Sequence, residues 1–221
     1  MTIEKIPWPI TRFYNSFVCK YLDNFYNQIA EEMSKNNIGG AILDAGTGPG
    51  RLPIKIAQLM PTVTIVGMDV SRDMIRIAQK NAEQASVNRA RFVVGSIYRT
   101  GFNDSTFDLV VSTGLVHHLE KPVQAFDELY RILKPQGEAW MYDGRRDASR
   151  EEMRITIGDF HGSGLTLPLW IVERVWPYMH VGYKTEEYTR GKVASALEES
   201  RFEDYQIATN NGFIKIVMRK G

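Results

Sequence analysis

Three glycines stand at alternate positions within Gly46–Gly50, directly after a short apolar run. Glycine has no Cβ, so a turn built from it bends sharply and lets a ligand approach the backbone closely. The turn leads from the apolar residues 41–45 into a helical pattern that begins at Arg51. This order predicts a strand, a turn and a helix that together cradle part of a small ligand, although such glycines also occur in purely structural turns.

Two acidic residues flank this turn and indicate what kind of ligand it holds. Asp44 precedes the turn, and Asp69 ends the next β-branched run. A carboxylate at the second position can accept two hydrogen bonds from a ribose diol. Asp44 can reach the amino group of an amino-acid moiety and would repel a pyrophosphate. The dinucleotide fingerprint also requires a glycine where this chain has Arg51. The pattern therefore favours a nucleoside with a cationic tail over a nicotinamide dinucleotide.

Alternating strands and helices must position these residues. Apolar and β-branched runs predict strands over residues 41–45, 62–68, 91–94, 108–112 and 138–142. Helical spacing predicts helices over residues 51–60, 71–85 and 123–133, the second of them capped by Ser71. Asn211-Gly212 lies between two further runs and predicts an antiparallel hairpin of residues 205–209 and 213–219. The expected fold is α/β, with a Rossmann-like doubly wound, mostly parallel sheet of seven strands.

Two segments stand outside this alternation. Aromatic residues at every fourth position predict one or two helices over residues 10–36, so we expect residues 1–38 to form an N-terminal helical cap. Residues 145–184 are expected to form a partly helical insertion, or lid, and residues 185–200 one helix. The Arg/Glu run from Arg145 to Arg154 is interpreted as a solvated helix face. All of these parts are expected to belong to one domain, residues 1–221.

Composition limits the compartment and the partners. Lys and Arg number 27 and Asp and Glu 26, so we expect no nucleic-acid partner. Cys19 is the single cysteine, and no apolar run approaches the ~20 residues of a membrane span. The four histidines lack metal-ligand spacing, so no metal is expected. We expect a cytoplasmic protein without a membrane partner, as a monomer or a homodimer.

At these residues the chain resembles the class I S-adenosylmethionine-dependent methyltransferases. Asp44-x-Gly46-x-Gly48-x-Gly50 is similar to their first motif, acid-x-Gly-x-Gly-x-Gly. Four further segments resemble motifs of the same superfamily: Gly67-Met68-Asp69-Val70-Ser71, Phe107-Asp108-Leu109-Val110-Val111-Ser112, His117-His118-Leu119 and Leu133-Lys134-Pro135-Gln136-Gly137-Glu138. The resemblance covers about residues 41–142 and is closest to the group that methylates small molecules.

The resemblance implies S-adenosylmethionine as the cofactor and a set of residues around it. These are Asp44, Ala45, Gly46, Thr47, Gly48, Gly50, Asp69, Val70, Met74, Ser96, Ile97, Ser112 and Thr113. The chain departs from the family after the third strand, where Ser96 stands in place of the commonest residue, Asp. Ser96 would hydrogen-bond the adenine amino group, and Ile97 would pack on the ring.

Candidates for catalysis and acceptor binding are less closely specified. His117, His118 and Asp143 are the candidate general bases, although a histidine after the fourth strand can equally pack or cap a helix. The resemblance implies that an N-terminal helix covers the ligand, which would bring Tyr14 or Tyr21 near its methionine end. The other candidate acceptor-binding residues are His118, Trp170 and Trp176. The two tryptophans belong either to the core of the insertion or to the acceptor pocket.

Three activities remain open at this point. The first is methyl transfer from S-adenosylmethionine to a small-molecule acceptor. The second is methylation of a protein or RNA docked on the Arg145 to Arg154 run, and the third is cofactor binding without turnover. Methyltransferases of exocyclic base amines resemble one another in an Asn/Asp-Pro-Pro-aromatic segment, and residues 112–115 read Ser-Thr-Gly-Leu instead.

Overall fold

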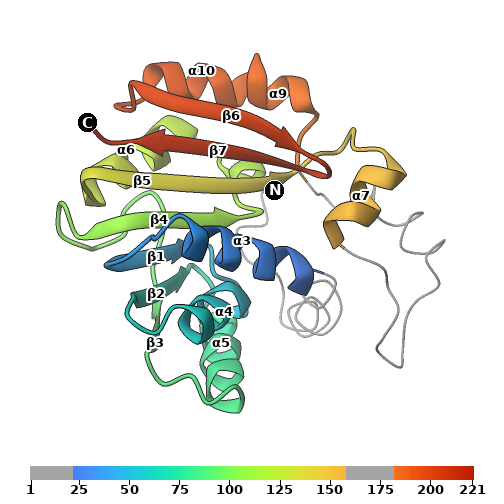
Figure 1. Cartoon of the computed structure of the whole chain (residues 1–221). Helices are drawn as coiled ribbons and strands as arrows, with labels where there is room; N and C mark the ends of the chain where they lie inside the picture. Colours follow the sequence, from blue (N-terminus) through green and yellow to red (C-terminus); the bar gives the residue numbers. More distant parts are fainter. Residues whose placement is uncertain (1–21, 158–181) are drawn as a thin grey trace.

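The computed structural model describes residues 22–157 and 182–221, and one mixed sheet runs through this part (Figure 1). Its order is β3-β2-β1-β4-β5-β7-β6. The strands are β1 (Ala41–Ala45), β2 (Thr64–Asp69), β3 (Ala90–Val94), β4 (Phe107–Thr113), β5 (Leu133–Gly144), β6 (Asp204–Asn210) and β7 (Phe213–Arg219). The first five run parallel to one another, and β7 runs antiparallel to both β5 and β6. The doubly wound, mostly parallel sheet with an antiparallel end is confirmed.

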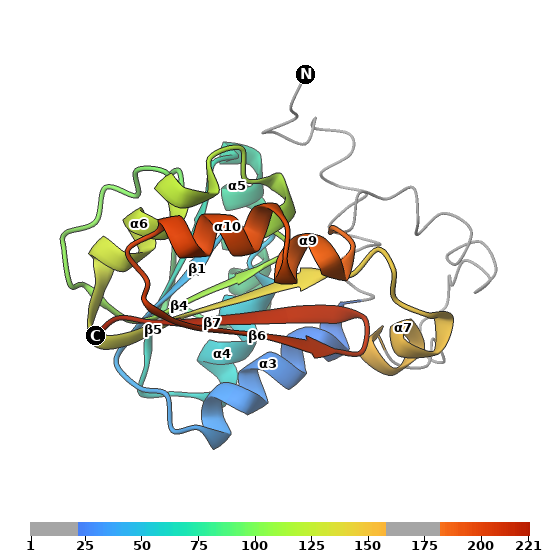
Figure 2. The same cartoon turned by 90° about the horizontal axis from the view of Figure 1, so that it is seen from above.

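Helices cover both faces of this sheet. The described helices are α3 (Asp23–Lys35), α4 (Arg51–Leu59), α5 (Arg72–Gln84), η2 (Val116–His118), α6 (Pro122–Ile132), α7 (Arg150–Ile157), α9 (Thr185–Thr189) and α10 (Lys192–Glu199). Figure 2 shows α3 and α4 on one face and α6 and α10 on the other. Each face has its own buried apolar cluster.

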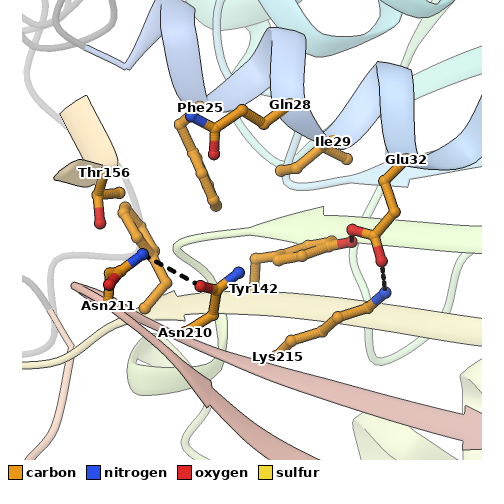
Figure 3. Close-up of a pocket in the computed structure, with 10 residues that line it drawn as sticks. Phe25, Gln28, Ile29, Glu32, Tyr142, Thr156, Asn210, Asn211 and Lys215 are labelled. Atoms are coloured by element: carbon orange, nitrogen blue, oxygen red, sulfur yellow. Dashed lines mark hydrogen bonds and ion pairs between the residues drawn. The ribbon is translucent and has the colours of Figure 1, made fainter. Parts of the chain in front are cut away.

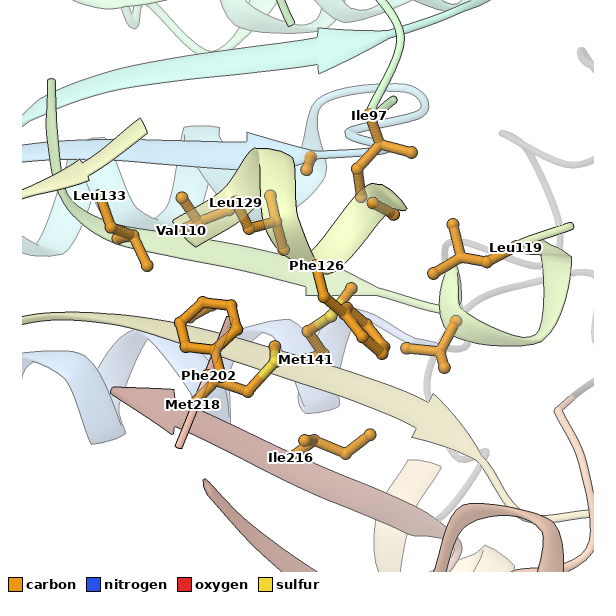
Figure 4. Close-up of a cluster of buried hydrophobic side chains, with 14 of the residues drawn as sticks. Ile97, Val110, Leu119, Phe126, Leu129, Leu133, Met141, Phe202, Ile216 and Met218 are labelled. Atoms are coloured by element: carbon orange, nitrogen blue, oxygen red, sulfur yellow. The ribbon is translucent and has the colours of Figure 1, made fainter. Parts of the chain in front are cut away.

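The cluster under α6 and α10 joins distant parts of the chain. Phe126 and Leu129 of α6 pack with Met141 of β5, with Phe202 in the connection before β6, and with Ile216 of β7, as Figure 4 shows. Burial of one such side chain stabilises a fold by roughly 1.5–3 kcal/mol. The parallel half and the antiparallel hairpin are thus held in one core.

Local sequence signals account for two features of the chain path. The Ser71 hydroxyl accepts a hydrogen bond from the Met74 amide at 3.4 Å and caps α5, as predicted. Asn211 lies in the left-handed region, with φ of 48°, in the turn between β6 and β7. Asn and Gly tolerate that conformation better than other residues, so the predicted hairpin forms there.

Two predicted boundaries are wrong. β5 begins at Leu133 rather than at residue 138, because Leu133 pairs with Phe107 ahead of an irregularity in the register. The helix expected over residues 185–200 is two helices, α9 and α10. Gly191 separates them with φ of −103° and ψ of −145°, which is not helical backbone.

The cap and the insertion are described in part. α3 represents the expected N-terminal cap, and α7 the expected helical part of the insertion. Four candidate acceptor residues, Tyr14, Tyr21, Trp170 and Trp176, lie outside the described residues. Within residues 22–157 and 182–221, no helix combines the length and apolar character needed to cross a membrane.

Arg145 does not belong to a solvated helix face, contrary to the prediction. Its side chain is 11% exposed and precedes α7 in sequence. The guanidinium donates to Thr185 Oγ1 at 2.9 Å, to Glu152 at 2.8 Å and to the Asn211 carbonyl at 2.6 Å. It therefore joins α7 to α9 and to the hairpin turn.

Candidate functional site

The glycine turn combines a tight contact with an open position. Gly46, Gly48 and Gly50 have φ values of 76°, 51° and 76°, in the left-handed region that favours glycine. A Cβ on Gly50 would lie 2.7 Å from the Ala78 Cβ and from the Phe92 ring, so Gly50 lets α4 begin close to its neighbours. A Cβ on Gly48 would meet no atom of the described residues within 4 Å. The turn thus has free space beside Gly48 into which a ligand can approach the backbone.

Asp69 ties this turn to the next helix. One carboxylate oxygen accepts from the Gly48 amide at 2.9 Å, and the other from the Ser71 amide at 2.8 Å. Burial raises the pKa of Asp69, and these two hydrogen bonds oppose the rise. The carboxylate therefore lies at the end of β2, beside the open glycine, where the fingerprint logic expects a ribose acceptor.

Asp44 is a buried carboxyl group without a full set of partners. Its side chain is 1% exposed, and Oδ1 has no hydrogen-bond partner among the described residues. The buried Thr47 side chain lies close enough to this carboxyl group to lower its pKa. Burial raises the pKa of Asp44 to about 7, and the charge of Asp69 adds to the rise. Buried polar groups are normally hydrogen-bonded, so a bound cationic group is the kind of partner this site lacks.

The candidate adenine residues lie beside the same strand ends. The Gly95 amide donates to the Asp69 carbonyl at 3.0 Å, which brings the segment after β3 next to the end of β2. Ser96 is half-buried and Ile97 is buried in the core. Val70, at 37% exposure, follows Asp69 directly. The structure thus groups the candidate residues that follow β2 and β3.

The end of β4 supplies the remaining candidate cofactor residues. The buried Ser112 hydroxyl donates to the Ala45 carbonyl at 2.6 Å and so joins the end of β4 to the end of β1. Thr113 follows, half-buried. From β1 the chain continues to β2 and β3 on one side of the sheet, whereas β4 and β5 lie on the other side of β1. Open α/β sheets bind ligands at such a switch point.

Of the two candidate histidines, the structure pairs His117 with Asp143. His117 Nδ1 lies 2.7 Å from Asp143 Oδ1, and the His117 amide donates to Asp143 Oδ2 at 2.8 Å. Asp143 is fully buried at the end of β5. His117 Nε2 is buried and has no hydrogen-bond partner among the described residues. His118 is exposed, with its ring centroid 3.9 Å from that of His117. The candidate bases His117 and Asp143 therefore form one unit, and His118 stands outside it.

Two tyrosines that the sequence analysis did not single out adjoin this pair. The buried Tyr188 hydroxyl donates to the Gly144 carbonyl at 3.0 Å and accepts from the Tyr183 amide at 2.9 Å. The Tyr183 ring lies edge-on to His117, with 6.4 Å between centroids. Both tyrosines are more than sixty positions away from His117 in the chain. No local pattern marks them, because only the tertiary fold brings α9 to the end of β5.

A separate small cavity lies under α3 and has its own polar network. Figure 3 shows Glu32 of α3 facing the cavity with Tyr142 and Lys215. Glu32 accepts from the Tyr142 hydroxyl at 2.9 Å and pairs with the Lys215 ammonium at 2.5 Å. Tyr142 and Asp143 are consecutive in a strand and so point to opposite faces of the sheet. The volume of about 60 Å³ is far below the ~300 Å³ of small-ligand pockets, so this cavity is not the cofactor site.

Metal ligands do not gather in the described part of the chain. Across residues 22–157 and 182–221, no group of three or more His, Cys, Asp or Glu side chains could hold a metal ion. His117 and Asp143 form a pair only. The site's polar chemistry therefore rests on two carboxylates at the glycine turn and on one imidazole–carboxylate pair.

Comparison with known proteins agrees with this fold. Residues 42–137 match the family model described as a methyltransferase domain. An uncharacterized methyltransferase of Schizosaccharomyces pombe is 33% identical over 102 residues, which is 43% of this chain and 37% of that protein. A ubiquinone/menaquinone biosynthesis C-methyltransferase of Geobacter sulfurreducens is 30% identical over 145 residues, or 65% of this chain and 57% of that protein. The chain thus spans between about a third and somewhat more than half of these relatives.

A solved structure matches nearly the whole chain. It is a candidate S-adenosyl-L-methionine-dependent methyltransferase of Methanococcus maripaludis, with a TM-score of 0.74 and 25% identity. The match covers 95% of this chain and 91% of the other. In its fold and over the matched segment, this chain is thus similar to the class I S-adenosylmethionine-dependent methyltransferase superfamily.

The residues at the turn fit the cofactor of that superfamily. S-adenosylmethionine carries an ammonium group, a ribose diol and a sulfonium group. The unpaired oxygen of buried Asp44 suits the ammonium group, and Asp69 at the end of β2 suits the diol. The open side of Gly48 leaves room for the ligand between these two carboxylates.

Proposed function

We propose that this protein transfers the methyl group of S-adenosylmethionine to a small-molecule acceptor. The observation that carries the proposal is Asp44, a buried carboxyl group beside an open glycine turn, with one oxygen that has no partner among the described residues. Asp44 binds the ammonium group of the methionine part, and Asp69 binds the ribose diol. Ser96 and Ile97 bind the adenine. The other cofactor contacts in this proposal are Ala45, Gly46, Thr47, Gly48, Gly50, Val70, Met74, Ser112 and Thr113.

Electrostatics favour this ligand over a dinucleotide. Asp44 and Asp69 are close enough for the charge of one to raise the pKa of the other. A ligand with a sulfonium and an ammonium group would reduce that repulsion, whereas a pyrophosphate would increase it. The same two carboxylates therefore select for a cation and against two phosphates.

The chain's contribution to the reaction is mainly to position the reactants. S-adenosylmethionine supplies a strongly electrophilic methyl group. The protein needs to hold the acceptor in line with that group and to exclude water, and positioning of this kind contributes roughly 7–11 kcal/mol to lowering a barrier. The ends of β4 and β5 adjoin the turn through the Ser112 hydroxyl, and we propose that the acceptor binds there.

Two observations support a small acceptor over a protein or an RNA. The G. sulfurreducens relative is named for ubiquinone and menaquinone biosynthesis, which concerns small molecules. Arg145, the first residue of the run that was to dock a macromolecule, is already bound to Thr185 and Glu152. We also propose one cytoplasmic domain, a monomer or homodimer, with residues 1–38 as cap and 145–184 as lid.

Calorimetric titration tests the cofactor assignment. The wild type and Asp69→Ala are titrated with S-adenosylmethionine, S-adenosylhomocysteine and NADH. We expect micromolar binding of both adenosyl ligands, at least about tenfold weaker binding in Asp69→Ala, and no binding of NADH, because a hydrogen bond to a charged group contributes roughly 1.5–3 kcal/mol.

Asp204→Ala is the matched control, since Asp204 is a carboxylate on the outermost strand, β6, with a 60% exposed side chain. It should bind the adenosyl ligands like the wild type. Binding of NADH alone, or equal affinity in Asp69→Ala, would refute the assignment. Transfer of labelled methyl groups to RNA or protein, with none to small molecules, would refute the acceptor class.

A further inference from the structure

The buried Nε2 of His117 has no hydrogen-bond partner among the described residues. The imidazole is 9% exposed, and its Nδ1 is bound to Asp143. An ionised carboxylate only accepts hydrogen bonds, so Nδ1 carries the hydrogen, and Nε2 of the neutral ring is a free acceptor. A histidine that served only packing would be expected to use both nitrogens when buried.

The carboxylate that orients this ring is itself fixed. Asp143 accepts from the His117 amide at 2.8 Å and from the Gly144 amide at 2.9 Å, in addition to the imidazole. These bonds tie η2 to the end of β5 and leave the ring little freedom to turn. The Tyr188 hydroxyl holds the next carbonyl, that of Gly144. The pair is therefore preorganised in the way that general bases require.

This pair lies on the ligand-binding edge of the sheet. β4 and β5 are neighbours, with Thr113 paired to Tyr142 at their carboxyl ends. His117 follows β4 by four residues, and Asp143 follows Tyr142 directly. The end of β4 is tied to the glycine turn by Ser112. A reactant held across these strand ends would lie between the cofactor residues and the imidazole.

Building on the proposed function, we infer that His117 Nε2 takes a proton from the acceptor during methyl transfer. Asp143 is the positioning residue. The acceptor is then a molecule whose nucleophile holds a proton at neutral pH, and we assign it to phenolic or enolic hydroxyls. The O–H bond breaks as its proton moves to Nε2, and an oxygen lone pair forms the bond to the methyl carbon. The carbon–sulfur bond breaks, leaving a thioether, a methyl ether and an imidazolium that later releases its proton to water.

The groups around His117 suit this proton transfer. Asp143 faces the ring from β5, and its negative charge stabilises the imidazolium. The His118 ring lies tilted beside it, with 42° between the ring planes, and Tyr183 faces it from the segment before α9. Two described cations lie in this region: Arg146 is close enough to lower the pKa of Tyr183, and the Lys192 ammonium donates to the Leu119 carbonyl. Neither makes a contact with the imidazole.

Nitrogen-15 NMR of the imidazoles tests the tautomer without any acceptor. In the wild type at about pH 8, His117 should show a protonated Nδ1 and a bare Nε2, as the Asp143 carboxylate requires. Asp143→Asn should change that pattern while S-adenosylhomocysteine binds within about twofold of wild type, because the cofactor residues are untouched. A protonated Nε2 with a bare Nδ1 in the wild type would overturn the inference.

Matched acceptors test the catalytic role. A panel of para-substituted phenols and the corresponding thiophenols is offered to wild type, His117→Gln and the control Asp204→Ala, which lies on the outermost strand. At about pH 8, methylation of the phenols by His117→Gln should fall by roughly 10²–10⁴-fold, the range of general-base catalysis. Thiophenols are largely ionised already, so their methylation should fall no more than about threefold. Asp204→Ala should resemble the wild type on both kinds of acceptor.

The outcomes separate this inference from the proposed function. If the wild type fails to bind S-adenosylhomocysteine, the proposed function fails. If it binds the ligand but methylates no phenol, or if His117→Gln methylates phenols at the wild-type rate, the proton-transfer inference alone is overturned. An equal loss on phenols and thiophenols would also overturn it, because that is the effect of a structural defect.

Discussion

Two buried aspartates lie at one edge of the sheet, and their surroundings are opposite. Asp44 of β1 has an oxygen without a partner among the described residues, and burial raises its pKa to about 7. Asp143 of β5 has both oxygens occupied, by His117 and by the Gly144 amide. The difference distinguishes a carboxylate whose hydrogen bonds are left for a ligand to complete from one whose hydrogen bonds the protein completes itself.

The regions around these aspartates differ in the same way. The glycine turn beside Asp44 is built from backbone geometry, with Gly48 open to solvent or ligand. The end of β5 is built from interlocking side chains, in which Tyr188 and Arg145 hold residues from α7, α9 and the hairpin. The first region has room for the cofactor, and the second holds a base rigidly beside it.

The largest effect is expected from Gly48→Ala. The new methyl group would enter the open space beside the turn, so we expect roughly 100-fold weaker binding of S-adenosylhomocysteine, or about 3 kcal/mol. The left-handed φ of 51° should add a stability loss of roughly 1–2 kcal/mol. Calorimetry and thermal unfolding measure the two effects.

Gly101→Ala is the matched control for this substitution. Gly101 also lies in the left-handed region, at φ of 79°, and a Cβ there meets nothing within 4 Å. It should show the same stability loss with unchanged affinity. Similar affinities in the two variants would break the comparison, because the space beside Gly48 would then not be ligand space.

A change of pH is expected to have a smaller effect on ligand affinity. The ionised form of Asp44 binds the ammonium group, and its pKa in the free protein is about 7. Affinity should therefore rise about tenfold between about pH 6 and about pH 8 and then level off. Titrations in two buffers of different ionisation enthalpy should detect proton release at the lower pH.

Asp44→Asn checks the origin of that dependence. It should flatten the pH profile of binding. Because the pKa is raised in the folded state, the folded protein binds more protons than the unfolded one between about pH 4 and 7, and stability falls as pH rises through this window. Asp44→Asn should therefore unfold at a higher temperature than wild type at about pH 8. A profile that persists in this variant would assign the titration to another group.

The smallest effect on cofactor affinity is expected from a substitution on the other face of β5. Glu32→Gln weakens the network with Tyr142 and Lys215 in the cavity of Figure 3. We expect a stability loss of roughly 1 kcal/mol, the usual contribution of a hydrogen bond, with affinity for S-adenosylhomocysteine within about twofold of wild type. Denaturant unfolding and calorimetry measure both. A large loss of affinity would show that the two faces are not independent.

The order of strands and helices along the chain and the glycine turn could be predicted from the sequence. Strand and helix signals are local, as in the apolar run before Gly46, the Ser71 cap and the Asn211-Gly212 turn. The boundary errors have equally local causes. Gly191 divides one predicted helix into two, and Leu133 begins β5 early by pairing with Phe107.

For acceptor binding and catalysis, the sequence predicted individual candidate residues but not the contacts between them. His117 and Asp143 were proposed independently, and their 2.7 Å contact joins residues 26 positions apart. The roles of Arg145 and Tyr188 depend on contacts across 66 and 44 positions. No periodic pattern records such distances, because they depend on how β4, β5 and α9 pack.

The central claim is tested most directly by titrating Asp44→Asn and Asp143→Asn with S-adenosylhomocysteine at about pH 8. If Asp44 binds the ligand and Asp143 binds only His117, Asp44→Asn should lose roughly 10- to 100-fold in affinity and Asp143→Asn less than about twofold. Equal affinities in the two variants, or a loss confined to Asp143→Asn, would contradict the account.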